Sequence, residues 1–563
     1  MKLLIVGGVA GGATAAARAR RLDERAEIVL FERGEHISFA NCGLPYYIGG
    51  VIEKRDDLLV TTAKALGDRY HVDIRVFTEV MSIDPNNKRV EARNLLTKKT
   101  YHESYDKLIL APGAEPLRPP LDGIELDTVL HLRNIPDSER IKSYVDRMKP
   151  EKAVVVGGGY IGLEMADNLV KRGVKTVILE MLDQVMAPLD YEMAALAHAH
   201  IKENGVVLEL ENGAKGFKKQ GKGTVVSTKK GKDIECDLVI LSIGVRPENK
   251  LASEAGLEIG ERGGIKVDAA MRTSNPDIFA VGDAVEVRDF VTGHPTMTAL
   301  AGPANKQGRI AADNAMGRKS LFKGTLGTSI VKIFDMTAAS TGASEKLLKK
   351  YNMPYQVSYT HSGSHASYYP GAQIMAVKLI FSPGNGKILG AQIVGGDGVD
   401  KRIDVMATAI RGGMTVYDLE ELELAYAPPF SSAKDPVNIA GFVATNILKG
   451  DVENVYWNEL NRADIKENIF IDLRNKDELE ESGTIPGALH VPLNDLRDKL
   501  ESLDKERAYI PFCAVGQRAY IGHRILSQKG FKSRNLSGGY RTYLGAKEKI
   551  MKESSATKLW LSE

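Results

Sequence analysis

The sequence predicts a multidomain α/β protein, and three observations support that prediction. The segment "LLIVGGVAGGATAAARARRL" shows an apolar strand, a glycine-rich turn and a helix, and "AEIVLFERG" follows as a second strand. The same order returns about 150 residues later in "AVVVGGGYIGLEMADNLVKRG" and "KTVILEMLDQ". Each is the pattern of a βαβ unit with parallel strands. The length of 563 residues exceeds what one hydrophobic core can serve, so we expect about three or four domains.

The composition is that of a globular protein without a membrane span. Hydrophobic residues make up 43% and charged residues 26% of the chain, and no apolar run approaches the roughly 20 residues that a membrane helix needs. The start, "MKLLIVGGVAGG", leads directly into the first glycine turn, so we interpret it as a strand and not as a signal peptide. Lysine plus arginine (75) nearly balances aspartate plus glutamate (73), which gives no argument for a nucleic-acid partner.

The three cysteines, Cys42, Cys236 and Cys513, are too few and too scattered for a disulfide framework, and they form no metal-binding cluster. We therefore expect a reducing, cytoplasmic location and no metal. In such a setting each thiol is either buried or reactive. Cys236, in "KDIECDLVIL" at the entrance of a strand, is expected to be buried and inert.

The second glycine turn predicts a nicotinamide dinucleotide site. "GGGYIGLE" matches G-x-G-x-x-G at Gly157, Gly159 and Gly162, after a strand and before a helix, and Glu180 follows about twenty residues on. The first glycine permits a tight turn, the second lets a pyrophosphate approach the backbone, and the third allows close helix packing. Glu180 would accept a hydrogen bond from a ribose 2′-hydroxyl and repel a 2′-phosphate. We expect NADH, with NADPH still possible.

The first glycine turn, "GGVAGG", is less regular, because Val9 occupies the middle glycine position. Two other segments, "YDKLILAPGAEP" and "DIFAVGDAVE", resemble those that close and complete the FAD domain of flavoprotein disulfide reductases. This resemblance implies an FAD site in which Glu32 binds the adenosine ribose and Asp283 the ribityl chain. The residues expected to line it are Gly7, Gly8, Gly11, Gly12, Glu32, Arg33, Ala111, Gly113, Gly282, Asp283 and Ala301.

The reactive thiol is expected at Cys42, in "SFANCGLPYYIGG". With the opening glycine turn, this segment resembles the coenzyme A-disulfide reductase branch of that family, near the single-cysteine NADH oxidases and peroxidases, over about residues 1–446. Relatives of the glutathione reductase type have a second cysteine five positions on, where this chain has Tyr47. Cys42 must therefore pair with an external sulfur or an oxygen. At a helix start, we expect the helix dipole to lower its pKa.

Two positions at which the relatives have a histidine differ in this chain, and both bear on which substrate Cys42 can reduce. The first glycine turn lacks the histidine that accompanies the reactive sulfur in NADH oxidases and peroxidases, and "ELAYAPPFSSAKDP" has Tyr426 where the glutathione reductase type has a histidine. Tyr426, with Tyr368 and Tyr369 of "SHASYYPGA", resembles the tyrosines that coenzyme A-disulfide reductases direct at the cysteine across a dimer interface. A phenol can hydrogen-bond a thiolate or donate to a leaving sulfur. Simple packing at the interface is the alternative.

The resemblance also implies a site for the nucleotide end of coenzyme A. Arg18 and Arg21 are three positions apart on the first helix, so they share a face. The implied set is Thr14, Arg18, Arg21, Ser38 and Asn41. Three phosphates need such cations. A solvated helix face is the alternative.

The C-terminal segment "PFCAVGQRAYIGHRIL" places Cys513 and Arg518 in a C-x-x-G-x-R loop before a helix. With "FIDLRN", "IPGALHVP" and "NLSGGYRTY", it resembles a rhodanese domain across residues 461–550. Such a loop turns backbone N–H groups toward the sulfur, Arg518 adds a fixed charge, and the cradled thiolate can carry sulfane sulfur as a persulfide. A regulatory or docking module is the alternative.

The expected fold is α/β, with two Rossmann-like nucleotide-binding domains for FAD and NAD, an α+β dimerisation domain and a C-terminal α/β rhodanese domain. The expected segments are 1–115 (FAD), 116–244 (NAD(P)H), 245–325 (FAD, second part), 326–446 (dimerisation), 447–460 (linker) and 461–553 (rhodanese-like).

Together these features predict an FAD-dependent NAD(P)H oxidoreductase. It would reduce coenzyme A disulfide, coenzyme A persulfide or polysulfide through Cys42, while Cys513 handles sulfane sulfur. Two alternatives stay open: an NADH oxidase or peroxidase that cycles Cys42 through sulfenic acid, and a redox sensor or sulfur relay that turns over little. The expected partners are a small sulfur substrate, coenzyme A and a second copy in a homodimer, with no nucleic acid and no membrane.

Overall fold

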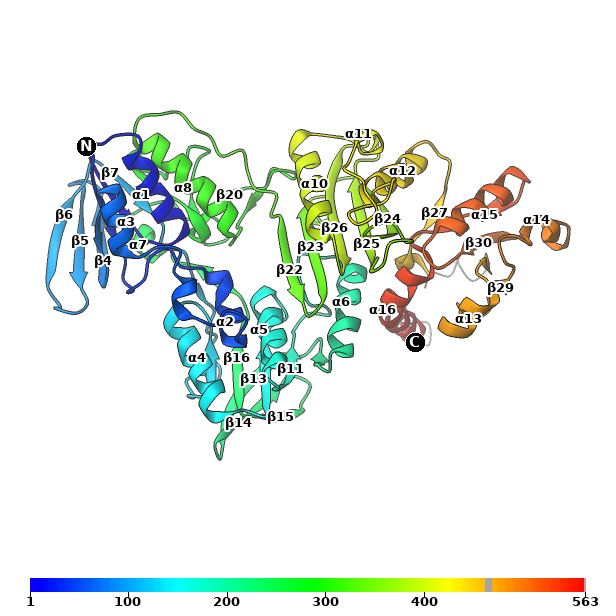
Figure 1. Ribbon diagram of the computed structural model, residues 1–563, viewed down its shortest axis with the longest axis horizontal. Coiled ribbons are helices and arrows are strands. Elements are labelled where there is room, and N and C mark those ends of the chain that lie inside the picture. Colours follow the sequence, from blue (N-terminus) through cyan, green and yellow to red (C-terminus); the bar gives the residue numbers. More distant parts are fainter. Residues whose placement is uncertain (461–467, 561–563) are drawn as a thin grey trace. The chain divides into compact units, whose positions relative to one another are not determined.

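The computed structural model describes residues 1–460 and 468–560, and they form two compact units (Figure 1). The first unit comprises residues 1–185 and 205–327. The second comprises residues 186–204 together with the chain from residue 328 onward. Residues 186–204, which the sequence pattern assigns to the 116–244 segment, thus pack with the later part of the chain.

The first unit is built on two five-stranded parallel sheets, each containing one glycine turn. The first sheet has the order β19-β7-β1-β2-β3. Its strands are β1 (Lys2–Val6), β2 (Glu27–Phe31), β3 (Asp73–Arg75), β7 (Lys107–Leu110) and β19 (Ile278–Ala280). Because β19 pairs with β7, the segment near residue 280 returns to the N-terminal sheet, as the sequence predicts. Helices α1 (Ala10–Arg20) and α8 (Ala301–Ala315) lie side by side on it (Figure 1).

The second parallel sheet has the order β12-β11-β10-β16-β9. Its strands are β9 (Val129–His131), β10 (Lys152–Val156), β11 (Lys175–Leu179), β12 (Val207–Glu209) and β16 (Leu238–Leu241), with helices α4 (Ile135–Met148) and α5 (Tyr160–Lys171). Val154 and Val155 on β10 are fully buried, which is why these strands are continuous apolar runs. Both predicted βαβ units are confirmed.

Smaller antiparallel elements complete the first unit. One sheet consists of β4 (Thr78–Asp84), β5 (Arg89–Asn94) and β6 (Thr100–Ser104), and another of β13 (Ala214–Gln220), β14 (Gly223–Thr228) and β15 (Asp233–Cys236). The strands β8 (Ala114–Pro116) and β17 (Val245–Pro247) pair where the chain leaves the first sheet and returns toward it.

The second unit begins with a five-stranded antiparallel sheet of order β22-β23-β26-β25-β24. Its strands are β22 (Ser329–Ile333), β23 (Met336–Gly342), β24 (Gln356–Gly363), β25 (Ile374–Phe381) and β26 (Ile388–Gly395). Helices α6 (Tyr191–Glu203), α10 (Val399–Gly412) and α12 (Pro436–Leu448) pack on this sheet, and α11 (Val416–Glu421) packs on α12. This confirms the mixed α/β unit predicted after residue 325.

The C-terminal part of the second unit has a parallel sheet of order β29-β28-β30-β31. Its strands are β28 (Asn468–Asp472), β29 (Leu489–His490), β30 (Ala508–Phe512) and β31 (Lys532–Ser533), and its helices include α13 (Lys476–Ser482), α15 (Gln517–Gln528) and α16 (Gly539–Trp560). The segment expected as a linker contains β27 (Asn454–Val455), which pairs with β32 (Asn535–Leu536). The expected domain start at residue 461 lies outside the described residues.

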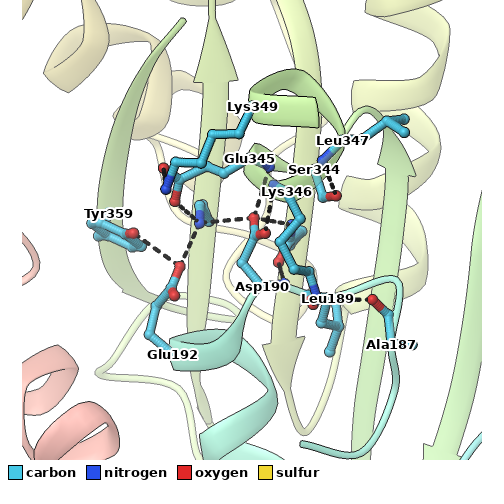
Figure 2. A network of polar contacts seen from close by, with 12 residues as sticks. Ala187, Leu189, Asp190, Glu192, Ser344, Glu345, Lys346, Leu347, Lys349 and Tyr359 are labelled. Carbon is cyan, nitrogen blue, oxygen red and sulfur yellow. Dashed lines mark hydrogen bonds and ion pairs between the residues drawn. The ribbon is translucent and has the colours of Figure 1, made fainter. Parts of the chain in front are cut away.

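A buried ion-pair cluster joins α6 to the antiparallel sheet (Figure 2). The ammonium of Lys378 on β25 is fully buried and contacts Asp190 at 2.9 Å, Glu345 at 2.5 Å, and Glu192. In Figure 2 the three carboxylates turn toward one point, and the hydroxyl of Tyr359 donates to Glu192 at 2.9 Å. Three acidic side chains this close would suit a metal ion, but the ammonium stands among them as the cation. The cluster therefore has a structural explanation.

Among the helices of the described residues, none combines the length and the apolar character that crossing a membrane requires.

Candidate active site

Cys42 is an exposed thiol at the start of a short helix. It lies in the 3₁₀ turn Asn41–Gly43, which leads into α2 (Leu44–Gly49). Tyr47, at the position where some relatives have a second cysteine, is buried in α2. The other two cysteines are buried, and burial raises the pKa of Cys236 to about 12. Cys236 is therefore inert, as expected.

The prediction that the pKa of Cys42 is lowered is wrong for the single chain without ligands. Although the residue is exposed to solvent, nearby protein atoms partly desolvate the thiol and raise its pKa, and the carboxylates of Glu164 and Asp283 raise it further. The helix dipole favours the thiolate, but α2 has only six residues, so its dipole is weak beside two nearby acidic groups. The neighbouring acids, which come from distant parts of the sequence, decide the direction.

Glu164 is a site residue that the sequence pattern did not single out. It lies on α5 and accepts a hydrogen bond from the hydroxyl of Tyr46 at 3.1 Å. Burial raises the pKa of Glu164 to about 7 although that hydrogen bond opposes the shift, and the charge of Glu164 contributes to the raised pKa of Tyr46. The sequence offers only a weak signal for this contact: Glu164 lies two positions after Gly162 of the second glycine turn, and Tyr46 lies four positions after Cys42.

The first glycine turn is tightly packed and leads directly into the N-terminus of α1. A Cβ on Gly12 would lie 1.8 Å from the carbonyl oxygen of Gly7, so only glycine fits there. The carboxylate of Glu32 accepts from the backbone N–H groups of Gly8 and Gly34 at 2.9 and 2.8 Å. Helix α1 begins at Ala10 without a side-chain cap, so N–H groups of its first turn can meet a phosphate.

The remaining residues expected at FAD surround the same turn. Ala111 donates its N–H to the carbonyl of Val6, Gly113 and Gly282 have positive φ, Ala301 begins α8, and Arg33 forms an ion pair with Glu248. Burial raises the pKa of Asp283 although the charge of Arg133 opposes the shift, and no hydrogen bond reaches its carboxylate from residues 1–460 and 468–552, whose side chains are described. A largely enclosed carboxylate of this kind suits the hydroxyl groups of a ribityl chain, so the residues fit the flavin nucleotide.

The second glycine turn repeats this geometry. A Cβ on Gly162 would lie 2.0 Å from the carbonyl oxygen of Gly157, whereas the space beside Gly159 is open for a ligand. The carboxylate of Glu180 accepts from the N–H groups of Gly158 and Leu182 at 2.7 and 2.8 Å. These bonds fix the carboxylate at the end of β11, where the glycine pattern leads one to expect a ribose hydroxyl.

The residues expected to hold coenzyme A lie together on α1 and near Cys42, but most already have protein partners. Arg18 forms an ion pair with Asp313 at 2.7 Å, and Arg21, just past the end of α1, lies over the ring of Tyr70. Thr14 donates to Asn305 at 2.6 Å. The amide of Asn41 donates to the carbonyl of Arg133 at 3.4 Å, and Ser38 has a φ of 47°.

The predicted tyrosines meet in the second unit. The hydroxyl groups of Tyr368, between β24 and β25, and Tyr426, between α11 and α12, are 2.8 Å apart, and both side chains are exposed. The hydrogen bond to Tyr426 raises the pKa of Tyr368. Tyr369 instead packs its ring against His365.

A buried arginine holds the two loops that present the tyrosines. Arg402 on α10 donates to the Ser364 carbonyl at 2.8 Å and to the Asp435 carboxylate at 2.9 Å, and it also reaches Ser431. Burial alone would raise the pKa of Asp435, but Arg402 holds it below its ordinary value. Because Ser364 precedes Tyr368 and Ser431 follows Tyr426, one guanidinium fixes both loops.

The C-terminal loop between β30 and α15 forms a cradle around Cys513. The N–H of Gly516, which has a φ of 100°, donates to the sulfur at 3.2 Å. Cys513 is buried, and Tyr540 donates its N–H to the Cys513 carbonyl at 2.7 Å. The guanidinium of Arg518 forms two hydrogen bonds of 2.6 Å with the carboxylate of Glu478. Glu478 is a second residue that the sequence pattern did not identify.

Comparison with known proteins decides the family. Residues 1–308 match the family described as pyridine nucleotide-disulphide oxidoreductase, and residues 328–436 match its dimerisation domain. The chain belongs to this family. It is an FAD- and NAD(H)-binding oxidoreductase with a C-terminal module, since residues 454–546 match the rhodanese-like domain.

Similar proteins extend over most or all of the chain. Coenzyme A disulfide reductase of Staphylococcus haemolyticus is 35% identical over 447 residues, which are 79% of this chain and all of that protein. The reduced Bacillus anthracis protein named CoADR-RHD is 50% identical, with a TM-score of 0.95 and 98% of each chain covered. A NAD-dependent persulfide reductase from A. fulgidus is 36% identical, with a TM-score of 0.91, covering 96% of this chain and all of that one.

Proposed function

We propose that this oxidoreductase uses NADH to reduce a sulfur–sulfur bond, in coenzyme A disulfide, coenzyme A persulfide or polysulfide, through the single thiol of Cys42. The observation that carries this proposal is an exposed cysteine with a buried tyrosine at the position of a second cysteine. The relatives named for coenzyme A disulfide and for persulfide support the substrate class.

The chemistry begins with attack of the Cys42 thiolate on one sulfur of the substrate. A bond forms between Cys42 and that sulfur, the sulfur–sulfur bond of the substrate breaks, and a thiolate or hydrosulfide leaves. When bound, FAD supplies two-electron transfer between the nicotinamide and the sulfur. Because the pKa of Cys42 is raised, the thiol keeps its proton at neutral pH more than an ordinary cysteine does. Because only the thiolate attacks, Cys42 has to lose its proton before or during the attack on the substrate sulfur.

For coenzyme A, we assign the phosphate end to Arg18 and Arg21, with Thr14, Ser38 and Asn41 closer to the thiol. The ion pair between Arg18 and Asp313 offsets part of the charge that a phosphate would meet, so phosphate binding has to compete with Asp313. Arg21, whose guanidinium lies over Tyr70, is the more available cation.

The tyrosine pair supports a homodimer in which a second copy completes the site. The side chains of Tyr368 and Phe430 are 73% and 70% exposed, and Tyr426 is also exposed. Large exposed aromatic side chains within a dimerisation domain are typical of an interface. In this assembly Tyr368 and Tyr426 of one copy would donate hydrogen bonds to the sulfur leaving at Cys42 of the other.

The rhodanese-like domain is assigned to sulfur handling. Cys513 would accept sulfane sulfur as a persulfide, stabilised by the Gly516 N–H and by the charge of Arg518. The free thiol groups on which both sites depend fit a reducing compartment, and we assign the protein to the cytoplasm.

The assignment is tested by Cys42→Ser and Cys513→Ser in the flavin-loaded protein. Cys42→Ser is expected to abolish reduction of coenzyme A disulfide and of persulfide while NADH still bleaches the flavin absorbance. Cys513→Ser is expected to slow polysulfide turnover and to leave coenzyme A disulfide turnover nearly unchanged. Persulfide turnover by Cys42→Ser would overturn the role of Cys42. Oxygen consumption by the wild type that exceeds sulfur reduction would favour an oxidase instead.

A further inference from the structure

The loop from Cys513 to Arg518 carries a single charged side chain, that of Arg518. The side chains between Cys513 and Arg518 are those of Ala514, Val515, Gly516 and Gln517, all uncharged. Arg518 is the one cation in this stretch, and its charge reaches the sulfur: Cys513 contributes to the raised pKa of Arg518, after the hydrogen bond to Glu478. The electrostatic character of the site therefore depends on what else Arg518 contacts.

Glu478 neutralises Arg518 through a two-pronged ion pair. Both guanidinium N–H groups of the pair point to Glu478, at 2.6 Å each, the geometry of the strongest arginine–carboxylate contacts. The hydrogen bond with Arg518 holds the pKa of Glu478 below its ordinary value, so the carboxylate is charged at neutral pH. Glu478 also accepts from the N–H of Asn475 at 3.0 Å as part of the cap of α13, which fixes its position.

A second nearby arginine is also neutralised. Arg474 is buried, donates to the Asp472 carboxylate at 2.7 Å, and lies 4.3 Å above the ring of Tyr540. It also donates to the Gly483 carbonyl. Its charge is matched by Asp472 and its hydrogen bonds are used within the protein, so it is not available to a ligand at Cys513.

One further cation lies beside the loop. The N–H of Arg541 donates to the Ala514 carbonyl at 3.0 Å, and its side chain is exposed. Burial lowers the pKa of His361 on β24 to about 3, with a contribution from the charge of Arg541. The charge of Arg541 therefore acts on His361 of the antiparallel sheet. Arg541 can serve as a control cation near the loop in the experiment below.

We propose that Glu478 sets the sulfur donor of Cys513: the loop takes sulfane sulfur from persulfides, which release a thiolate, and discriminates against thiosulfate, which releases the dianion sulfite. This deepens the proposed function, since it rests on Cys513 as a sulfur carrier. Glu478 is a positioning and charge-balancing residue that acts through Arg518. A dianionic leaving group needs positive charge that Arg518, shared with Glu478, does not supply in full.

The two donors react with Cys513 by the same displacement at sulfur. With a persulfide, the Cys513 thiolate attacks the terminal sulfur of R–S–SH, a sulfur–sulfur bond forms on Cys513, the donor bond breaks, and R–S⁻ leaves. With thiosulfate, the same attack on the outer sulfur releases SO₃²⁻. No net electrons are transferred in either case, and the two steps differ in the charge that develops on the leaving group.

The test measures persulfide formation on Cys513 in the full-length, flavin-loaded protein. Cysteine persulfide and sodium thiosulfate are the donors, and alkylation followed by peptide mass spectrometry follows the Cys513 peptide with time. The wild type is expected to load at least about fivefold faster from cysteine persulfide than from thiosulfate at equal concentration, since a partly exposed charge pair is worth up to about that factor. Glu478→Gln is expected to raise the thiosulfate rate about fivefold and to change the persulfide rate by less than about twofold.

Three variants make the result specific. Glu480→Gln removes an acid from the same helix that pairs with Lys476 and not with Arg518, so it should match the wild type. Glu478→Asp keeps the charge, so it should retain the wild-type donor ratio and serves if Glu478→Gln fails to fold. Arg541→Ala should leave the ratio unchanged.

The outcomes separate the two proposals. Equal loading of the wild type from both donors, an unchanged ratio in Glu478→Gln, or a ratio that follows Arg541 would overturn the role of Glu478 while Cys513 remains a sulfur carrier. Absence of loading on Cys513 from either donor would overturn the proposed sulfur-carrying function itself, and this inference with it. Far-UV circular dichroism and a thermal unfolding curve that match those of the wild type report that each variant is folded.

Discussion

Replacement of Lys378 by methionine should destabilise the second unit by about 3–5 kcal/mol, because it leaves buried carboxylates without their cation. At an effective dielectric constant of about 20, one pair of unit charges at the 2.9 Å between Lys378 and Asp190 attracts by about 6 kcal/mol before desolvation. Glu345 and Glu192 add similar contacts. Desolvation of the ammonium opposes these gains in the wild type, so the net loss is smaller than their sum.

The loss should depend on pH in a defined direction. Burial opposes ionisation of Asp190, but Lys378 holds its pKa below the ordinary value in the wild type. A depressed carboxylate pKa stabilises the folded state above the pKa of the unfolded chain, and that contribution disappears as pH falls through the folded pKa. In Lys378→Met this contribution is absent at neutral pH. The difference between variant and wild type should therefore shrink between about pH 5 and pH 3.

Urea unfolding followed by tryptophan fluorescence measures this effect, because the ring of Trp457 lies 6.0 Å from that of Tyr191 on α6. Lys349→Met is the matched control, since Lys349 is largely exposed to solvent and its ammonium lies 3.8 Å from the Glu345 carboxylate. Adding Glu192→Gln to Lys378→Met should recover part of the loss by removing one unpaired charge. A loss below about 1 kcal/mol, equal to that of the control, would show that the carboxylates are solvated and would refute the reasoning.

Three other predictions concern the active site. Glu164→Gln should lower the pKa of Cys42, seen as faster alkylation by iodoacetamide near pH 8, because the charge of Glu164 contributes to raising that pKa; an unchanged pH profile of alkylation would contradict this. Glu180→Ala should narrow the preference for NADH over NADPH about tenfold, measured as the ratio of kcat/KM values, and a ratio that stays the same would argue against ribose recognition by Glu180. Tyr426→Phe should reduce kcat for coenzyme A disulfide about tenfold without a matching change in KM; loss of the dimer in sedimentation would instead assign this tyrosine to packing.

The sequence predicted the parts of the fold whose physics is local. In both glycine turns, a Cβ at Gly12 or Gly162 would collide with the carbonyl of a glycine five positions earlier. The requirement for glycine therefore arises within a short motif that the sequence displays. Cys42 and Cys513 were likewise found through short motifs. Glu164 and Glu478 were missed because each acts on its cysteine from a helix far away in sequence, and a single acidic residue in a helix carries no pattern. Lys378 was missed because it occupies an interior strand position that reads as apolar.

The two cysteines differ in a way that fits a division of labour. Partial desolvation and the charges of Glu164 and Asp283 raise the pKa of Cys42, whereas the sulfur of the buried Cys513 accepts a hydrogen bond from the Gly516 N–H at 3.2 Å. A thiol with a raised pKa yields less thiolate, but each thiolate is more nucleophilic and leaves less readily once it is in a mixed disulfide. In a disulfide with coenzyme A, Cys42 is therefore a poorer leaving group than a cysteine of ordinary pKa would be. The raised pKa favours Cys42 as the thiol that keeps its bound substrate sulfur, and the loop that cradles Cys513 fits a thiol that accepts sulfur and passes it on.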